Sequence, residues 1–199
     1  MKKYDPNEYL LENLLPRILA IKPVTDQSDI FECLGGDPEL ISQSSCRIQF
    51  GNQIESFGNK VISDVTTNLL EESNYVIIGG KKRQVDHLFI TKGGIICYLE
   101  SKCNLNFDSE KVIMSNEKVK ILAEKFGNIV PYYFVPVRRQ PRREHIVKYK
   151  KEGIEVVGME WISNQIDLPF GIDHYFTFLK EVCGPIMEEK GMILKDPRK

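Results

Sequence analysis

The chain has 199 residues, close to the size of a single domain. Hydrophobic residues make up 42% of it and charged residues 28%, as in ordinary globular proteins, which excludes a mostly disordered or fibrous chain. Its 27 Lys and Arg nearly balance 28 Asp and Glu, and the net charge of -1 argues against a uniformly basic nucleic-acid coat and a strongly acidic tail protein.

The first residues and the cysteines indicate where the protein works. Asp5, Glu8 and Glu12 interrupt what would have to be an apolar stretch in a secretory signal. The five cysteines are scattered and form no C-x-x-C pair, which is typical of reduced thiols rather than of a disulfide framework or a zinc site. We therefore expect a soluble, cytoplasmic protein.

Helical patterns come first along the chain. Leucines and isoleucine at helical spacing predict a helix over 6–21 that is kinked or restarted at Pro16. Prolines and glycines in 22–51 predict loops and short helical turns. Apolar residues at i, i+3, i+4 and i+7 then predict a helix over about 52–70.

The rest of the chain alternates between strand and helix patterns. The expected strands are 75–79, 84–90, 95–102, 129–137 and 154–158. One helix should begin at Asp108 or Ser109 and end at Phe126, and a last helix should cover about 171–190. This order predicts an α/β fold in which helices flank a central mixed β-sheet.

Prolines and glycines set the expected connections of these strands. Pro131 and Pro136 indicate that the strand 129–137 bends or lies near an edge of the sheet. The sequence T-K-G-G at 91–94 predicts a hairpin between the second and third strands.

Three charged residues flank this hairpin. Asp86 lies on its first strand, and Glu100 and Lys102 lie on its second. Residues two apart on a strand point to the same face, and a hairpin centred on Gly93 places Asp86 opposite Glu100, so that all three side chains converge. This requires an odd-length loop such as 92–94 with a glycine in the left-handed conformation. A two-residue loop would shift the register by one and separate the set, unless a bulge intervened.

This set suits metal-assisted hydrolysis of a phosphate ester. Two neighbouring carboxylates bind a hard divalent cation such as Mg²⁺, which keeps several waters and also takes phosphate oxygens. A neighbouring ammonium group, here that of Lys102, can orient a water and stabilise negative charge in the transition state. His87 neighbours Asp86 but should point to the opposite face, which favours a packing role for it.

The acidic-x-Lys pattern occurs twice in the chain. The second copy, Glu188-Glu189-Lys190, lies at a polar helix end, where we expect a solvated surface. The first copy, Glu100-Ser101-Lys102, closes an otherwise apolar strand, where a charge is costly unless it is paired or functional. The alternative to a catalytic role is a cross-strand ion pair at the rim of the sheet.

The segment 81–111, KKRQVDHLFITKGGIICYLESKCNLNFDSEK, resembles the metal-binding core of the PD-(D/E)XK nucleases, and specifically that of small type II restriction endonucleases. In that family a first Asp precedes, by one hairpin, an (Asp/Glu)-x-Lys at the end of the next strand. Asp86, Glu100 and Lys102 match those positions. The resemblance covers roughly residues 52–137 and implies a restriction-endonuclease-like core within a single nuclease domain, 1–199, whose flanking segments serve DNA recognition or dimerisation.

The same resemblance implies further metal ligands. The backbone carbonyl of Ser101 would be one, and Glu55, in the sequence Gln53-x-Glu55 of the predicted 52–70 helix, is similar to a glutamate that often precedes this hairpin in the family. Glu55 could equally be a solvated helix residue. One departure from the family pattern is Val85, which stands where many members have proline before the first Asp.

Basic residues gather in one run. The sequence RRQPRREHIVKYKK at 138–151 carries a net charge of +6, and the rest of the chain carries -7. Arginine forks suit phosphates and guanine edges, lysines suit phosphates, and Gln140 and His145 could read bases. An exposed, solvated loop is the alternative. The candidate DNA-binding residues are Arg138, Arg139, Gln140, Arg142, Arg143, Lys148 and Lys150, with Lys81, Lys82 and Arg83 before the Asp86 strand.

These features together predict a Mg²⁺-dependent type II restriction endonuclease. By resemblance, it would hydrolyse phosphodiester bonds at a specific short sequence of double-stranded DNA, work as a homodimer and reside in the cytoplasm of a prokaryotic cell. Two alternatives stay open: another nuclease with the same core, for DNA repair or junction resolution, and a non-catalytic DNA-binding module in which the Glu100–Lys102 pair is structural.

Overall fold

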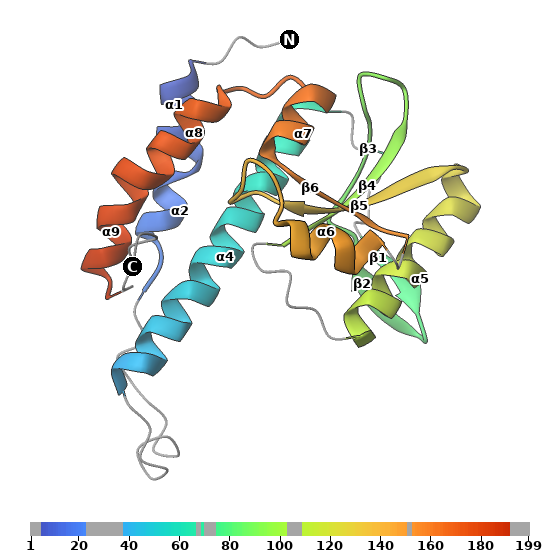
Figure 1. The fold of residues 1–199 in the computed structure, drawn as a ribbon, viewed down its shortest axis with the longest axis horizontal. Coiled ribbons are helices and arrows are strands. Elements are labelled where there is room, and N and C mark those ends of the chain that lie inside the picture. Colours follow the sequence, from blue (N-terminus) through green and yellow to red (C-terminus); the bar gives the residue numbers. More distant parts are fainter. Residues whose placement is uncertain are drawn as a thin grey trace. The chain divides into compact units, whose positions relative to one another are not determined.

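The computed structural model shows an α/β chain that divides into two compact units (Figure 1). It describes residues 5–22, 38–66, 69, 75–102, 109–150 and 153–191, with the backbone alone for 38–44 and 109–111. The first unit comprises 58–168, and the second comprises 2–57 together with 169–199. The predicted core, 52–137, overlaps mainly with the first unit, and the single nuclease domain stays a prediction.

The first unit contains a four-stranded sheet in the order β3-β4-β5-β6. Its strands are β3 (His87–Ile90), β4 (Ile96–Ser101), β5 (Ile129–Val135) and β6 (Glu155–Gly158). β3 and β4 are antiparallel, whereas β4, β5 and β6 are parallel, so the central mixed sheet is confirmed. Parallel neighbours need crossover connections, which here contain the helices α5 (Ser109–Phe126) and α6 (Arg143–Lys150).

Helices cover both faces of this sheet, as the sequence predicts. On one face, α5 and α6 pack on Tyr133 of β5 through Val112 and Tyr149. On the other face, Asn59 and Ile62 near the end of α4 (Pro38–Val65) line a cavity with Phe89 of β3. The helix α7 (Met159–Gln165) follows β6 directly.

The predicted ends of α5 agree with the structure. Gly127 has a φ of +84°, and its N–H donates to the carbonyl of Ala123 at 2.9 Å, which closes the helix at Phe126. Ser109 is the first helical residue, and the other candidate for the start, Asp108, lies outside the described residues.

The hairpin between β3 and β4 has the odd-length loop that convergence of the charged residues requires. His87 pairs with Leu99 and Ile90 with Ile96, which centres the hairpin on residue 93. Gly94 has a φ of +77°, and its N–H donates to the carbonyl of Thr91 at 2.9 Å. Of the two registers that the sequence left open, the structure has the one that places Asp86 opposite Glu100.

Gln84, the first residue of the second predicted strand, belongs instead to a separate hairpin. β1 (Tyr75–Ile78) and β2 (Lys81–Gln84) form a two-stranded antiparallel sheet. Gly79 and Gly80, with φ values of +56° and +75°, make its turn. The prediction of one strand over 84–90 was wrong because Val85 and Asp86 separate β2 from β3.

The proline-containing strand β5 lies between β4 and β6, one strand from the edge of the described sheet, which agrees with the expected position near an edge. β6 pairs only with residues from Tyr132 onward, so Pro131 precedes the segment that has two neighbours. Pro136 follows the last strand residue, Val135. Both prolines therefore avoid the part of the ladder where a missing N–H would cost a hydrogen bond.

The second unit is helical. Its elements in chain order are α1 (Pro6–Asn13), α2 (Leu15–Leu19), residues 38–57 of α4, α8 (Ile172–Phe178), the π-helical turn η1 (Leu179–Cys183) and α9 (Gly184–Glu189). The rings of Tyr9, Phe57, Phe170 and Tyr175 form its aromatic core, with centroid separations of 5.3–6.3 Å. The predicted helix restart at Pro16 and the C-terminal helical segment are confirmed.

One N-terminal prediction was wrong. Residues 38–51, expected as loops and short turns, form the first half of α4. Pro38 is the first residue of the helix, a position where its missing N–H costs nothing, and interior glycines such as Gly51 are tolerated. The expectation for 23–37 lies outside the described residues, and α4 ends at Val65 rather than near residue 70. Among the described helices, none is long and apolar enough to cross a membrane.

Candidate active site

Asp86, Glu100 and Lys102 come together at one end of the β3–β4 hairpin; we call them the acidic cluster. Asp86 Oδ2 accepts a hydrogen bond from the backbone N–H of Ser101 at 2.9 Å. Lys102 Nζ lies 3.6 Å from Asp86 Oδ2 and 3.5 Å from Glu100 Oε1. The ammonium group of Lys102 thus lies between the two carboxylates.

The backbone explains this convergence. Asp86 stands one residue before the His87–Leu99 pair, so the observed register places it opposite Glu100. The N–H of Lys102 donates to the carbonyl of Phe134 at 2.8 Å, which extends the β4–β5 ladder by one residue and keeps the strand alternation. Glu100 and Lys102 therefore share a face, as the sequence predicts.

A second lysine, which the sequence-based prediction missed, completes the surroundings of Glu100. Lys118 of α5 places its Nζ 2.9 Å from Glu100 Oε2, and the hydroxyl of Tyr98 donates to the same oxygen. Lys118 is 8% exposed and Glu100 7% exposed. Lys118 lies three residues after Ser115 and four before Leu122, and both of these residues are buried. This helical spacing places a charged residue on the buried face of α5, which was the sequence signal that could have identified Lys118.

The two carboxylates have different electrostatic environments. Burial, and next the charge of Glu100, raise the pKa of Asp86 to about 6, although Lys102, Lys118 and the N–H of Ser101 act in the opposite direction. Burial also acts to raise the pKa of Glu100, but Lys118, Lys102 and the hydrogen bond from Tyr98 outweigh it, and the pKa of Glu100 is lowered. Glu100 is thus held charged, whereas Asp86 exchanges its proton close to neutral pH.

The donor set fits a hard divalent cation. In the described parts of the chain, no three His, Cys, Asp or Glu side chains gather as a metal site. Mg²⁺, however, is commonly held by one or two carboxylates and keeps several waters. Asp86 uses Oδ2 for the Ser101 N–H and Glu100 uses Oε2 for Lys118, which leaves Oδ1 and Oε1 as candidate metal ligands. Coordination by the Ser101 carbonyl stays a prediction.

Glu55 lies on α4, among the residues of the second unit, and is half-buried. The acidic cluster belongs to the first unit. A role for Glu55 as a metal ligand therefore stays a prediction.

The basic run has more regular structure than a loop. Its residues Arg143–Lys150 form α6, in which Tyr149 is fully buried and its ring packs edge-on against that of Tyr133, with centroids 5.1 Å apart. The side chains of Arg139, Gln140, Arg142, Arg143, Lys148 and Lys150 are exposed, and that of Arg138 is half-buried. Lys151 lies outside the described residues.

The first part of this run lies at the same edge of the sheet as the acidic cluster. β4 and β5 are parallel, and Ser101 is level with Phe134, so the segment after Val135 emerges beside Lys102. Some of its polar groups already have partners: Gln140 Nε2 donates to Glu160 Oε2 at 2.7 Å, and Arg142 lies 3.3 Å from Glu144. Such exposed pairs are weak, so these side chains can exchange partners for phosphate.

The second basic group, Lys81, Lys82 and Arg83, lies on the β1–β2 hairpin, and its residues differ in exposure. Lys81 and Lys82 are exposed, and Lys82 Nζ lies 4.4 Å from the centroid of the Tyr75 ring. Arg83 is half-buried opposite Val76, and its buried Nε makes no hydrogen bond among the described residues. The two lysines therefore suit a phosphate contact better than Arg83 does.

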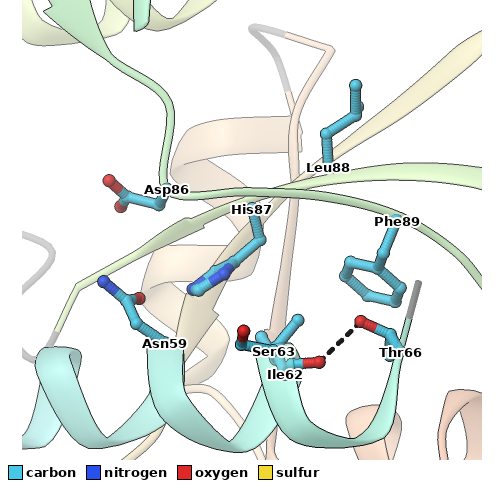
Figure 2. A pocket seen from close by; sticks show the side chains of 8 residues that line it. All are labelled: Asn59, Ile62, Ser63, Thr66, Asp86, His87, Leu88 and Phe89. Carbon is cyan, nitrogen blue, oxygen red and sulfur yellow. Dashed lines mark hydrogen bonds between the residues drawn. The ribbon is translucent and has the colours of Figure 1, made fainter. Parts of the chain in front are cut away.

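The side chains of His87 and Asp86 point in different directions, and both line one cavity (Figure 2). His87 lines this cavity of about 190 Å³ with Asn59 and Ser63 of α4 and with Thr66, which follows α4. Burial lowers the pKa of His87 to about 3, so its ring is neutral at physiological pH. The cavity is smaller than typical ligand pockets and suits a few waters.

Comparisons with known proteins give only weak likenesses. No family model and no curated protein match the chain. Among solved structures, it is similar to a repair endonuclease from Pyrococcus abyssi, with a TM-score of 0.34 and 23% identity over 54% of this chain and 44% of that chain. It is also similar to a structure described as an EndoMS-dsDNA2 complex, with a TM-score of 0.30 and 21% identity over 45% of this chain and 38% of that chain. The chain thus spans less than half the length of either structure.

Proposed function

We propose that this protein is a Mg²⁺-dependent endonuclease that hydrolyses phosphodiester bonds in double-stranded DNA, and that it cuts at a specific short sequence as a type II restriction endonuclease. The observation that supports this most is the convergence of Asp86, Glu100 and Lys102 at the end of β4. The family that the sequence resembles uses this set of residues in this order.

Each member of the acidic cluster has a distinct task in this proposal. Asp86 and Glu100 hold the metal ion through Oδ1 and Oε1, the oxygens that the Ser101 N–H and Lys118 leave available. A divalent cation there supplies charge neutralisation at the scissile phosphate and activation of water. The side chain of Lys102 is 29% exposed, so its ammonium group can donate hydrogen bonds to the attacking water and to the phosphate. By resemblance, the products carry 5′-phosphates and 3′-hydroxyls.

The basic residues support DNA as the substrate. The segment that begins at Arg138 follows the edge of the sheet at which the acidic cluster lies, and its exposed arginines and lysines suit contacts with the phosphate backbone. A homodimer is part of the proposal, because two copies of one site can cut both strands of a palindrome. The descriptions of the two solved structures, a repair endonuclease and an EndoMS-dsDNA2 complex, agree in kind with this proposal, which does not depend on them.

The direct test is digestion of a supercoiled plasmid by the purified protein with Mg²⁺, and again with a chelator. We expect discrete, reproducible fragments with Mg²⁺ and none with the chelator, with cut ends that map to one short sequence. The variant Lys102→Met, prepared at the same concentration, controls for a contaminating nuclease and should not cut.

Two other outcomes would replace this proposal. Cutting restricted to branched or mismatched DNA would contradict the restriction specificity and support a repair or junction nuclease. A folded protein that binds DNA but cuts neither plasmid nor branched DNA at any Mg²⁺ concentration would contradict the nuclease and leave a DNA-binding module. Sedimentation of the protein with and without DNA tests the homodimer.

A further inference from the structure

Lys118 differs from Lys120 and Lys125 of the same helix in its surroundings. Its residue is 8% exposed, and its Nζ lies 2.9 Å from Glu100 Oε2. Lys120, two residues further along the same helix, is exposed. A buried lysine is retained only where a buried partner compensates its charge, so the Lys118–Glu100 pair constrains both side chains.

The contacts of Glu100 divide between its two oxygens. Oε2 accepts hydrogen bonds from Lys118 Nζ and from the hydroxyl of Tyr98. Oε1 faces Lys102, at 3.5 Å, on the side of Asp86. A carboxylate held through one oxygen presents the other in a fixed direction, which is the arrangement that a monodentate metal ligand requires.

Lys118 also sets the net charge of this region. The formal charges cancel among the four groups in contact, which are Asp86, Glu100, Lys102 and Lys118. Without Lys118 the remaining three would carry one net negative charge within a buried setting. A divalent cation would then be attracted more strongly, because charges interact more strongly inside a protein than in water.

We propose that Lys118 is a positioning residue of the metal site: it orients Glu100 through Oε2 and, by its charge, lowers the affinity of the site for the metal ion. This inference rests on the proposed function. It implies that the affinity for metal and the rate of cleavage respond to Lys118 in opposite directions. A merely structural ion pair would not separate the two quantities in this way.

Two substitutions separate the charge of Lys118 from its hydrogen bond. Lys118→Met removes both, whereas Lys118→Gln removes the charge and keeps an N–H donor. Lys120→Met is the matched control, because it removes an exposed lysine from the same helix. Thermal unfolding of all variants shows which are folded, and if Lys118→Met does not fold, Lys118→Gln carries the test of charge.

The measurements are Mg²⁺ titration of the DNA-free protein by calorimetry and the single-turnover rate of plasmid cleavage. We expect both Lys118 variants to bind Mg²⁺ about tenfold more tightly than the parent and Lys120→Met to be unchanged. Cleavage by Lys118→Met should fall at least about tenfold, and Lys118→Gln should retain more of the parent rate.

Equal Mg²⁺ affinities in the Lys118 variants and the control, or weaker binding in the former, would overturn the charge effect. Cleavage by Lys118→Met at the rate of Lys120→Met would overturn the orienting role. Both failures leave the proposed function intact provided that the parent binds Mg²⁺ and cuts DNA. A parent that does neither would overturn the proposed function itself and this inference with it.

Discussion

The two acidic-x-Lys triplets of this chain have the same residue pattern and opposite surroundings. In Glu100–Lys102, the glutamate is buried and each of its oxygens faces a lysine. In Glu188–Lys190, both glutamates are exposed, and the lysine donates to the backbone carbonyls of Leu19, at 3.0 Å, and Ile21. The pattern alone therefore does not define a site, and the position of each triplet in the fold determines how its charges are paired.

The second triplet also corrects an expectation. A fully solvated surface was predicted there, and Glu188 and Glu189 agree with it, but Lys190 is half-buried. Its ammonium group satisfies carbonyls at and just after the end of α2, which have no partner within that helix. Lys190 thus stabilises the junction between two helical segments that are far apart in the sequence.

The largest expected difference between the triplets is in cleavage. Glu100→Gln removes the charge that the metal needs and should reduce the cleavage rate by about a thousandfold or more. Glu188→Gln removes an exposed carboxylate of the other triplet and should leave the rate within about twofold. Single-turnover plasmid cleavage, with far-ultraviolet circular dichroism to verify folding, compares the two. A comparable loss in both variants would remove the distinction between the triplets.

The second expected difference is in pH dependence. The pKa of Asp86 is raised to about 6, so its carboxyl takes up a proton as the pH falls through this value, and a metal must then displace the proton. We expect Mg²⁺ affinity to be level above pH 7 and to fall about tenfold per pH unit well below pH 6. Calorimetric titrations between pH 5 and 8 measure this, and an affinity that does not change over the range would contradict the buried state of Asp86.

The same raised pKa has a consequence for stability. The folded protein binds this proton more tightly than the unfolded chain, so the charge of Asp86 destabilises the fold above pH 6, and the penalty disappears as the pH falls towards 4. Asp86→Asn should therefore unfold at higher denaturant than the parent at pH 8, by about 1–3 kcal/mol, and lose this advantage near pH 4. Urea unfolding at both pH values is the measurement. If Asp86→Asn were more stable than the parent at pH 4 and not at pH 8, the result would contradict a raised pKa of Asp86.

The second triplet should respond in stability rather than in activity. Lys190→Met leaves the carbonyls of Leu19 and Ile21 without their lysine partner and should lower the free energy of unfolding by about 1–2 kcal/mol. Cleavage per folded molecule should not change. Lys180→Met, which removes an exposed lysine of the same unit, is the control. Equal stability of the two variants would show that the contacts of Lys190 contribute nothing measurable.

The smallest expected effect concerns the exposed basic helix. Replacing Arg143 and Lys150 by glutamine should weaken DNA binding several-fold and reduce the slope of log Kd against log salt by up to about two, because each of these side chains can neutralise one phosphate. The control replaces Lys22 and Lys180, two exposed lysines of the other unit, by glutamine. This control removes the same number of positive charges and should leave the slope of log Kd against log salt unchanged. Equal slopes in both double variants would contradict DNA binding through α6.

Much of the fold could be predicted where local chemistry decides it. Glycines at 93 and 94 predicted the hairpin and narrowed its register to two choices, and Gly127 predicted the end of α5. The prediction failed where long-range packing overrides a local signal. For residues 143–150, the sequence indicated a basic run but not its helix, in which the buried Tyr149 packs against Tyr133 of the sheet.

In the candidate site, too, local signals could be read from the sequence and long-range packing could not. Asp86, Glu100 and Lys102 could be brought together from the sequence, because strand alternation and one turn relate all three. Lys118 could not, because its contact with Glu100 depends on the packing of α5 against β4, across 18 residues of sequence. Periodicity places Lys118 on the buried side of its helix, but does not say which residue it meets there.

The most direct test of the acidic cluster is diffraction from crystals of this protein soaked in Mn²⁺, recorded at a wavelength where manganese scatters anomalously. We expect an anomalous peak between the carboxylates of Asp86 and Glu100, about 2–2.3 Å from one oxygen of each, and no peak at Glu188 and Glu189. A peak at the second triplet in place of the first, or no peak at the acidic cluster at millimolar Mn²⁺ and pH 8, would contradict a metal site built from Asp86 and Glu100.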